Sequence, residues 1–186
     1  MSQPDFETVK SNWETFEKLC GRLSDANINT LLTTLGERLI TTPSTTHDSR
    51  PGCFGGGLVQ TSLEVTSKMR KIASEFYPEI QVSSILKVGL LHEIGKVGTL
   101  EEDLFLDQES DWHREKLGQY YKYNENINKA ATPERTLYLL QHFGIKLTHD
   151  EYYAIRLSQG SHLEENRFYA NVEPDLATCL QVAKRL

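Results

Sequence analysis

His92 and Glu93 form the residue pair with the most specific chemistry in this chain, in the segment Leu90-Leu91-His92-Glu93-Ile94-Gly95-Lys96. An imidazole nitrogen beside a carboxylate oxygen suits a divalent transition metal, which can activate water for attack on phosphorus. Two adjacent side chains cannot surround an ion, so a working metal site needs further ligands from other parts of the chain.

Several segments carry a resemblance to a known family. Gly56-Gly57-Leu58-Val59-Gln60-Thr61 and the His92 segment are similar to the metal-binding core of HD-domain phosphohydrolases, where the first would end in a histidine and the second would read His-Asp. The region from about Pro43 to Lys184 resembles a branch of that family associated with tailed bacteriophages. The most distinctive match is Asp111-Trp112-His113-Arg114-Glu115-Lys116-Leu117-Gly118-Gln119-Tyr120. Further matches are Thr42-Pro43-Ser44-Thr45-Thr46-His47, Phe54-x-Gly56-Gly57-Leu58-Val59, Leu139-Leu140-Gln141-x-Phe143-Gly144-Ile145, Glu151-x-x-Ala154-Ile155 and Asn166-x-x-Tyr169.

The chain departs from the metal ligands that this resemblance implies. Thr61 takes the place of the first histidine, Glu93 that of the aspartate, Ser158-Gln159 that of a His-Asp pair and Lys184 that of a distal aspartate. A neutral hydroxyl is a poor ligand for a transition metal, and a lysine brings a cation where an anion should hold the metal. We therefore expect no catalytic residues and no working metal centre. His92 and Glu93 remain residual ligand candidates, with His47 and His162 as available replacements.

Basic and aromatic residues near the matched segments are candidate contacts for an anionic ligand. Arg50, in a glycine-rich loop, can hold an anion through two parallel hydrogen bonds. Trp112 and its basic neighbours combine a stacking surface with donors, which suits a base and its phosphates. The complete set of candidate ligand contacts is His47, Arg50, His92, Lys96, Trp112, His113, Arg114, Lys116 and Arg156.

These residues also have structural interpretations. Arg50 can be a solvated loop residue, and Lys96 can cap the last carbonyls of a helix. Trp112 can anchor an irregular segment on the core, and His92 can be a buried histidine bonded to a nearby carbonyl. Arg156 is included because the resemblance implies that its helix faces the site.

Three functions are compatible with these residues. In the first, which we expect, a catalytically degenerate HD-like domain binds a nucleotide-like ligand without hydrolysis and without a cofactor. The bacteriophage resemblance suggests sequestration of a host nucleotide signal of immunity, an argument by analogy. In the second, the chain is an active nucleotide phosphohydrolase with altered ligands and requires a divalent metal. In the third, it is a protein-interaction module on a vestigial HD scaffold. A homo-oligomer would suit a ligand large enough to need a pocket shared between subunits.

Composition favours a cytoplasmic protein, in the host cytoplasm if the chain is phage-encoded. The net charge of -6 argues against a nonspecific nucleic-acid binder, which needs a basic surface. The 3 cysteines, an odd number without C-x-x-C spacing, suit free thiols in a reducing compartment. The N-terminal residues lack a signal-peptide pattern, and no apolar run approaches the roughly 20 residues that span a bilayer, so no membrane contact is expected.

Hydrophobic periodicity and capping signals predict a mostly helical chain. Helices are expected over 6–23, 24–40, 58–77, 82–94, 132–143, 148–157 and 174–186, with starts at Pro4-Asp5, Ser24-Asp25, Thr132-Pro133-Glu134, the capping box Thr148-x-x-Glu151 and Glu173-Pro174-Asp175. A loop is predicted over 41–57, and a short hairpin or irregular elements over 97–129.

The predicted fold is an all-α, HD-domain-like helical bundle with a small irregular or hairpin insertion. A single domain is expected over 1–186, with N-terminal helices in 1–40 and the HD-like region in 43–186, because 38% of the 186 residues are hydrophobic and no linker or repeat interrupts them. The helix over 82–94 should be central and buried. On the preceding helix, the predicted core face is Leu58, Val65, Met69, Ile72 and Phe76.

Overall fold

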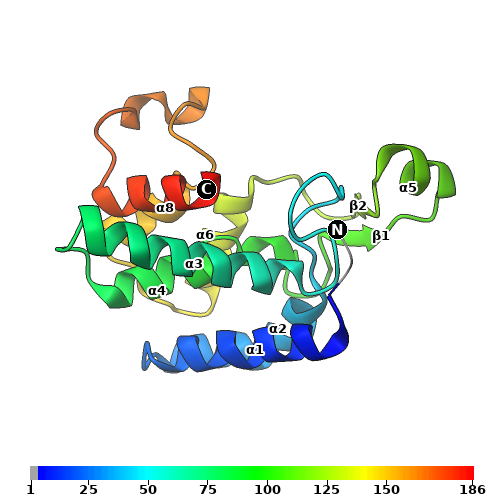
Figure 1. Cartoon of the computed structure of the whole chain (residues 1–186), viewed down its shortest axis with the longest axis horizontal. Coiled ribbons are helices and arrows are strands. Elements are labelled where there is room, and N and C mark those ends of the chain that lie inside the picture. The colour runs from blue at the N-terminus through cyan, green and yellow to red at the C-terminus, as the bar shows by residue number, and fades with distance from the viewer. Residues whose placement is uncertain (1–3) are drawn as a thin grey trace.

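The computed structural model describes residues 4–186 and consists mainly of packed helices (Figure 1). In chain order the elements are α1 (Phe6–Gly21), α2 (Ala26–Thr41), α3 (Gly57–Phe76), α4 (Val82–Leu91), the 3-10 helix η1 (Ile94–Val97), β1 (Phe105–Asp107), α5 (Asp111–Leu117), β2 (Tyr121–Tyr123), α6 (Thr132–His142), α7 (His149–Arg156), the 3-10 helix η2 (Glu164–Tyr169) and α8 (Asp175–Arg185). The predicted all-α class with a small hairpin insertion is confirmed.

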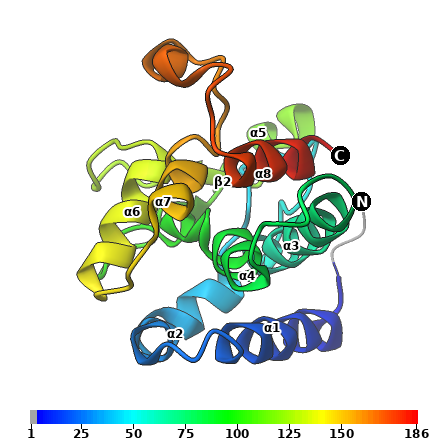
Figure 2. The same ribbon diagram turned by 90° about the vertical axis from the view of Figure 1, so that its left-hand side faces the viewer.

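Helix α3 is the centre of the bundle. It packs against α1 and α2 on one side and against α4 and α8 on the others. Figure 2 shows the layers: α1 and α2 lie below, α3 and α4 in the middle, and α8 above, with α6 and α7 beside them. The fully buried side chains of these helices, among them Leu31, Met69, Leu91 and Leu180, form one continuous core.

Local capping signals set several helix starts as predicted. The Asp5 side chain accepts a hydrogen bond from Thr8 N at 2.8 Å, and that of Asp25 accepts one from Asn27 N at 2.9 Å. Thr148 and Glu151 form the predicted capping box, in which Glu151 N donates to Thr148 Oγ1 and Thr148 N donates to Glu151 Oε2. These helix starts are determined by hydrogen bonds between residues close in sequence, so they could be predicted from the sequence.

The predicted continuous helix over 82–94 is wrong, because α4 ends at Leu91 and His92 is its C-cap. Close packing against α6 explains the break. Gly95 N donates to Thr136 Oγ1 at 3.0 Å, and Thr136 Oγ1 donates to His92 O at 3.2 Å. A Cβ atom on Gly95 would lie 2.6 Å from Thr136 N, so only glycine lets η1 approach α6 this closely. The turn places His92 and Glu93 between two elements instead of on one helix face.

Phe76 was predicted to belong to the core face of α3, and this is wrong. Leu58, Val65 and Met69 are buried as predicted, but Phe76 is 71% exposed. The chain leaves the helix at Tyr77, and the partly buried Tyr77 packs on the core at this end. Helical periodicity alone does not show where the neighbouring helices stop covering a face.

The predicted hairpin is present and contains an inserted helix. Strands β1 and β2 pair antiparallel, with Phe105 opposite Tyr123, and α5 lies between them in sequence. Helix α5 starts at the N-cap Ser110 and ends at Gly118, whose φ of 63° places it in the left-handed region. The hairpin and α5 project from the bundle on the right of Figure 1.

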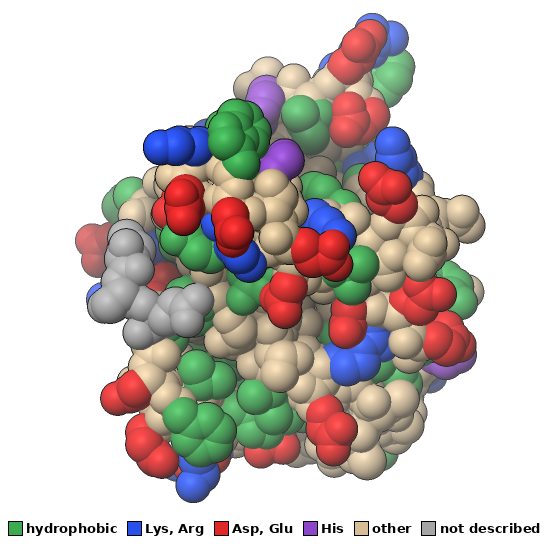
Figure 3. All heavy atoms as spheres, turned by 90° about the vertical axis from the view of Figure 1, so that its right-hand side faces the viewer, with side chains coloured by type: hydrophobic (Ala, Val, Ile, Leu, Met, Phe, Trp, Pro, Cys, Tyr) green, Lys and Arg blue, Asp and Glu red, His purple; other side chains and the backbone are tan. Residues whose placement is uncertain are grey.

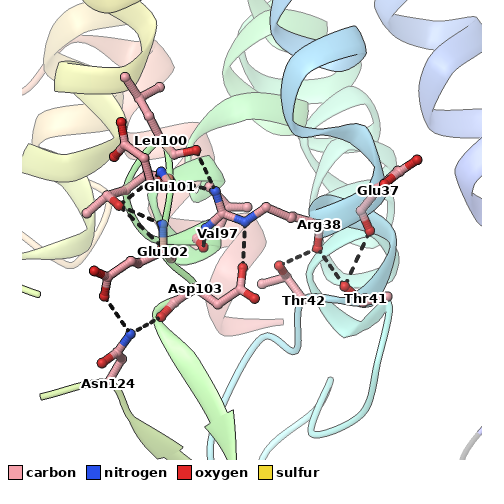
Figure 4. A network of polar contacts seen from close by, with 11 residues as sticks. Glu37, Arg38, Thr41, Thr42, Val97, Leu100, Glu101, Glu102, Asp103 and Asn124 are labelled. Atoms are coloured by element: carbon pink, nitrogen blue, oxygen red, sulfur yellow. Dashed lines mark hydrogen bonds and ion pairs between the residues drawn. The ribbon is translucent and has the colours of Figure 1, made fainter. Parts of the chain in front are cut away.

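Arg38 of α2 fixes the turn between η1 and the hairpin (Figure 4). Its Nε donates to Asp103 Oδ1 at 2.6 Å, Nη1 donates to the carbonyl oxygens of Thr99 and Leu100 at 2.9 and 3.0 Å, and Nη2 donates to Val97 O at 2.9 Å. One guanidinium therefore satisfies three backbone carbonyls and one carboxylate. Through this contact the N-terminal helices hold the segment that follows His92 and Glu93.

Two further findings bear on the chemistry of the chain. Within residues 4–186, no helix is both long enough and apolar enough to cross a membrane. Cys20, Cys53 and Cys179 are free thiols. Burial raises the pKa of Cys20 to about 12 and that of Cys179 to about 11, which keeps both thiols protonated and unreactive.

Candidate functional site

Glu93 lies between two lysines, one on each of its carboxylate oxygens. Lys96 Nζ donates to Glu93 Oε2 at 2.6 Å, and Lys184 Nζ donates to Glu93 Oε1 at 2.8 Å. The side chains of Glu93, Lys96 and Lys184 are 14%, 16% and 21% exposed. We call these three residues the Glu93 cluster; its carboxylate is bound by cations on both sides.

Separate parts of the chain form this cluster and its surroundings. Glu93 follows α4, Lys96 belongs to η1, and Lys184 lies in the last turn of α8. Ser44, in the loop after α2, accepts hydrogen bonds from Lys96 Nζ and from Thr61 Oγ1 of α3, each at 3.1 Å. Hydrogen bonds thus connect Thr61 to Lys184, and three of the positions at which the chain departs from the HD ligand pattern meet in space.

Electrostatics keep Glu93 ionised. Burial by itself would raise the pKa of this carboxyl, but the two ammonium groups of Lys96 and Lys184 outweigh it and hold the pKa well below its usual range. Because two cations surround one anion, the cluster carries a surplus positive charge.

His92 is neutral and only 1% exposed. Burial, and next the nearby Lys184, lower the pKa of His92 to about 4. Its Nδ1 lies 3.0 Å from Gly89 O, and a carbonyl can only accept, so Nδ1 carries the proton and Nε2 keeps a lone pair. Among the described residues, the buried atoms His92 Nε2 and Ser158 Oγ have no hydrogen-bond partner. The structural interpretation of His92 as a histidine bonded to a nearby carbonyl therefore fits this geometry.

The residues of this site do not fit a divalent metal. Each oxygen of Glu93 already accepts a hydrogen bond from a lysine ammonium, and Thr61 offers a hydroxyl that donates to Ser44. An incoming cation would have to displace Lys96 and Lys184 against their positive charge. Across residues 4–186, no three His, Cys, Asp or Glu side chains are grouped closely enough to share a metal ion. The donor set suits anions better than cations.

Six other predicted contacts lie in the loop after α2 and around α5. The backbone of His47 pairs with Gln119, and Asp48 N donates to Gly118 O at 2.9 Å, so the loop packs against the end of α5. Trp112 is 59% exposed. Figure 3 shows this face, where acidic and basic side chains alternate. Three of the six, Arg50, Trp112 and Lys116, are exposed. The other three contact neighbouring residues: His47 Nδ1 lies 2.8 Å from Thr46 Oγ1, His113 Nδ1 lies 2.8 Å from Ser110 Oγ, and Arg114 donates to Gln108 O and to Asp111.

Arg156 belongs to a different contact from the other predicted residues. Its Nη1 donates to Asn166 Oδ1 at 2.8 Å, and Asn166 Nδ2 donates to Gly160 O at 2.8 Å. Arg156 thus holds η2 against the end of α7. Of the nine predicted ligand contacts, His92 and Lys96 lie at the Glu93 cluster, six lie around α5, and Arg156 lies at η2.

Sequence reasoning missed two residues that shape the site. Ser44 links Thr61 to Lys96, and Arg38 holds the turn after η1. Ser44 lies in a segment that carried the family resemblance, so a signal for it existed. Arg38 gave no signal, because its partners are 59 to 65 residues away in sequence.

No protein-family model, no curated protein and no solved structure matches this chain.

Proposed function

We propose that the chain is a catalytically degenerate relative of the HD phosphohydrolases that binds a nucleotide-like ligand without hydrolysing it. The observation that carries this proposal is the Glu93 cluster, in which Lys96 and Lys184 occupy both oxygens of the carboxylate. Metal-dependent hydrolysis needs that carboxylate free to bind a metal. Binding needs only enclosure and complementary charge.

The cluster retains donors for an anion. Lys96 lines a cavity of about 280 Å³, together with Thr42 and Tyr121 and with two carboxylates, Asp107 and Asp103, of which Asp103 is paired with Arg38. Its ammonium uses two of its three N–H groups, on Glu93 and Ser44, so one is left for a ligand oxygen. With the surplus positive charge, this arrangement favours a phosphate or a similar oxyanion. Tyr121 adds an aromatic ring beside the cavity.

The nucleotide-like nature of the ligand, and the sequestration of a host signal in a phage context, come from the family resemblance and remain part of the proposal. The resemblance itself is supported by the convergence of Thr61, Glu93 and Lys184, residues far apart in sequence that are linked through Ser44 and Lys96.

A nucleotide panel tests the proposal. Linear and cyclic nucleotides are added to the purified protein with and without Mn²⁺, while the melting temperature and phosphate release are recorded. We expect at least one nucleotide to stabilise the protein, by about 2.7 kcal/mol at 100 times its Kd, without phosphate release. Mass spectrometry of copurifying small molecules identifies the natural ligand.

Matched variants locate the binding. Lys96→Met should reduce the nucleotide-induced shift, and Lys71→Met, an exposed lysine of α3, should leave it unchanged. Metal-dependent phosphate release by the wild type would overturn the proposal in favour of an active hydrolase. The absence of any shift across the panel would overturn it in favour of a protein-interaction module.

A further inference from the structure

A large cavity lies away from the Glu93 cluster, between the hairpin and the start of α6. This groove has a volume of about 1110 Å³. Lys122 and Tyr123 of β2, the segment 124–131 and Arg135 of α6 line it. A groove of this size can hold a small organic ligand.

Arg135 is the unusual residue of the groove. It is only 8% exposed, and Nη2 donates to Asn128 O at 3.1 Å. Within residues 4–186, no carboxylate forms an ion pair with it. The guanidinium N–H groups that form no hydrogen bond within the protein are open to solvent, and Arg135 is part of the groove lining.

Most of the Arg135 side chain is covered, yet no carboxylate pairs with its guanidinium, and covering a charged group without an opposite charge costs free energy. The same burial lowers the pKa of Arg135, although arginine keeps its proton in proteins. Buried charges in proteins are normally paired, so a missing partner inside a groove points to a ligand that supplies it.

The surroundings define the chemistry of that ligand. Lys122 and Lys129 join Arg135 in the lining, against the single carboxylate of Glu125, although the whole chain carries a net charge of -6. Outside the lining, the exposed Glu109 lies 3.6 Å from Lys122 Nζ in an ion pair that a ligand can replace. Three cations match the several oxygens and multiple charges of a phosphate, and a guanidinium binds phosphate through two parallel hydrogen bonds. Tyr123, 61% exposed on the same wall, offers a ring for stacking.

We propose that this groove is a second binding site, which takes a phosphorylated small molecule with an aromatic ring and anchors its phosphate on Arg135. Lys122 and Lys129 neutralise the remaining charge, and Tyr123 stacks on the ring. The site does not depend on the function proposed for the Glu93 cluster, since different residues form it.

Pyrophosphate and ATP are suitable probes, with citrate as an anion that lacks phosphate. Binding to the full-length wild type and its variants is measured by calorimetry and by thermal shift. We expect pyrophosphate and ATP to bind, ATP more tightly because its ring can stack on Tyr123, and citrate to bind more weakly than either. Arg135→Met should weaken pyrophosphate binding on the order of 10- to 100-fold, the effect of losing charge-assisted hydrogen bonds.

Three further variants test whether pyrophosphate binds in the groove. Arg70→Met removes an exposed arginine of α3 and should change nothing. Lys96→Met removes a cation of the Glu93 cluster, which itself favours oxyanions. The part of pyrophosphate binding that is lost in Arg135→Met should remain in Lys96→Met, so each variant reports on its own site. Arg135→Lys keeps the charge but not the paired geometry, and should weaken binding with the fold preserved even if Arg135→Met does not fold. The proposal would be overturned if both Arg135→Lys and Arg135→Met bound pyrophosphate as tightly as the wild type. It would also be overturned if the wild type preferred citrate or bound none of the probes.

Discussion

The Glu93 cluster and the Arg135 groove handle buried charge in opposite ways. In the cluster, one carboxylate is bound by two ammonium groups at 2.6 and 2.8 Å, and Ser44 satisfies a further donor. In the groove, Arg135 is 8% exposed, and its guanidinium donates to a backbone carbonyl and, within the described residues, pairs with no carboxylate.

This difference separates charge that maintains the fold from charge that is available to a ligand. Removing one member of a buried ion pair leaves the others uncompensated, which is strongly destabilising. Removing a buried charge that has no partner relieves a desolvation cost instead. Mutations in the two regions should therefore change stability in different directions.

The largest effect is expected for Glu93→Gln. It leaves the ammonium groups of Lys96 and Lys184 facing each other with no carboxylate between them. We expect the free energy of unfolding, measured by urea denaturation, to fall by about 3 kcal/mol, at the lower end for buried pairs because all three side chains keep some exposure. Glu75→Gln, an exposed position on α3, is the matched control. A loss no larger than that of the control would show that the cluster does not hold the fold.

Acid should destabilise the protein by a similar amount. The pKa of His92 falls from 6.5 to about 4 in the folded chain, so between these values the unfolded chain binds more protons. The neutral His92 contributes about 3 kcal/mol to the free energy of unfolding above pH 6.5, and this contribution is lost as the pH falls towards 4. Glu93, whose pKa is depressed, adds a further loss below about pH 4.5.

The variant His92→Asn isolates this contribution. Asparagine retains a donor for Gly89 O but cannot titrate. Urea unfolding across pH 7 to 4.5 should give a flatter stability profile for His92→Asn than for the wild type. Identical slopes would contradict a neutral His92 in the folded chain.

A smaller loss is expected for Arg38→Met. The variant removes the hydrogen bonds to Val97, Thr99 and Leu100 and the ion pair with Asp103. We expect a loss of about 2 kcal/mol, since the exposed part of this network contributes little. Hydrogen exchange should become faster over 97–103. Unchanged exchange there, with Arg70→Met as the reference, would mean that α2 does not position the site.

The smallest effect on stability is expected for Arg135→Met in the absence of ligand. Replacing an unpaired buried guanidinium with an apolar side chain should leave the melting temperature unchanged or raise it slightly. A clear drop in the melting temperature would place Arg135 with the Glu93 cluster, as a charge that the fold requires. That result would remove the contrast between the two regions.

Sequence reasoning succeeded where neighbouring residues decide the structure. Asp5, Asp25 and the capping box of Thr148 and Glu151 set helix starts through contacts only two or three residues apart. The apolar periodicity of α3 identified most of its buried face, and the substitution pattern indicated that Lys184 belongs with Glu93.

Prediction from the sequence failed where contacts between distant elements determine the structure. The end of α4 depends on how Gly95 meets Thr136 of α6. The exposure of Phe76 depends on where neighbouring helices stop. Neither the clamp formed by Arg38 nor the missing partner of Arg135 leaves a mark in local sequence, because each is defined by residues brought together only in the folded chain.

The central claim is that lysine ammonium groups hold the Glu93 carboxylate and leave no place for a divalent metal. Calorimetric titration of the wild type with Mn²⁺, beside the variant Thr61→His, Glu93→Asp, Lys184→Asp, tests it most directly. We expect no binding by the wild type, and binding by the variant, which introduces a histidine and two aspartates around His92. Stoichiometric Mn²⁺ binding by the wild type would contradict this claim.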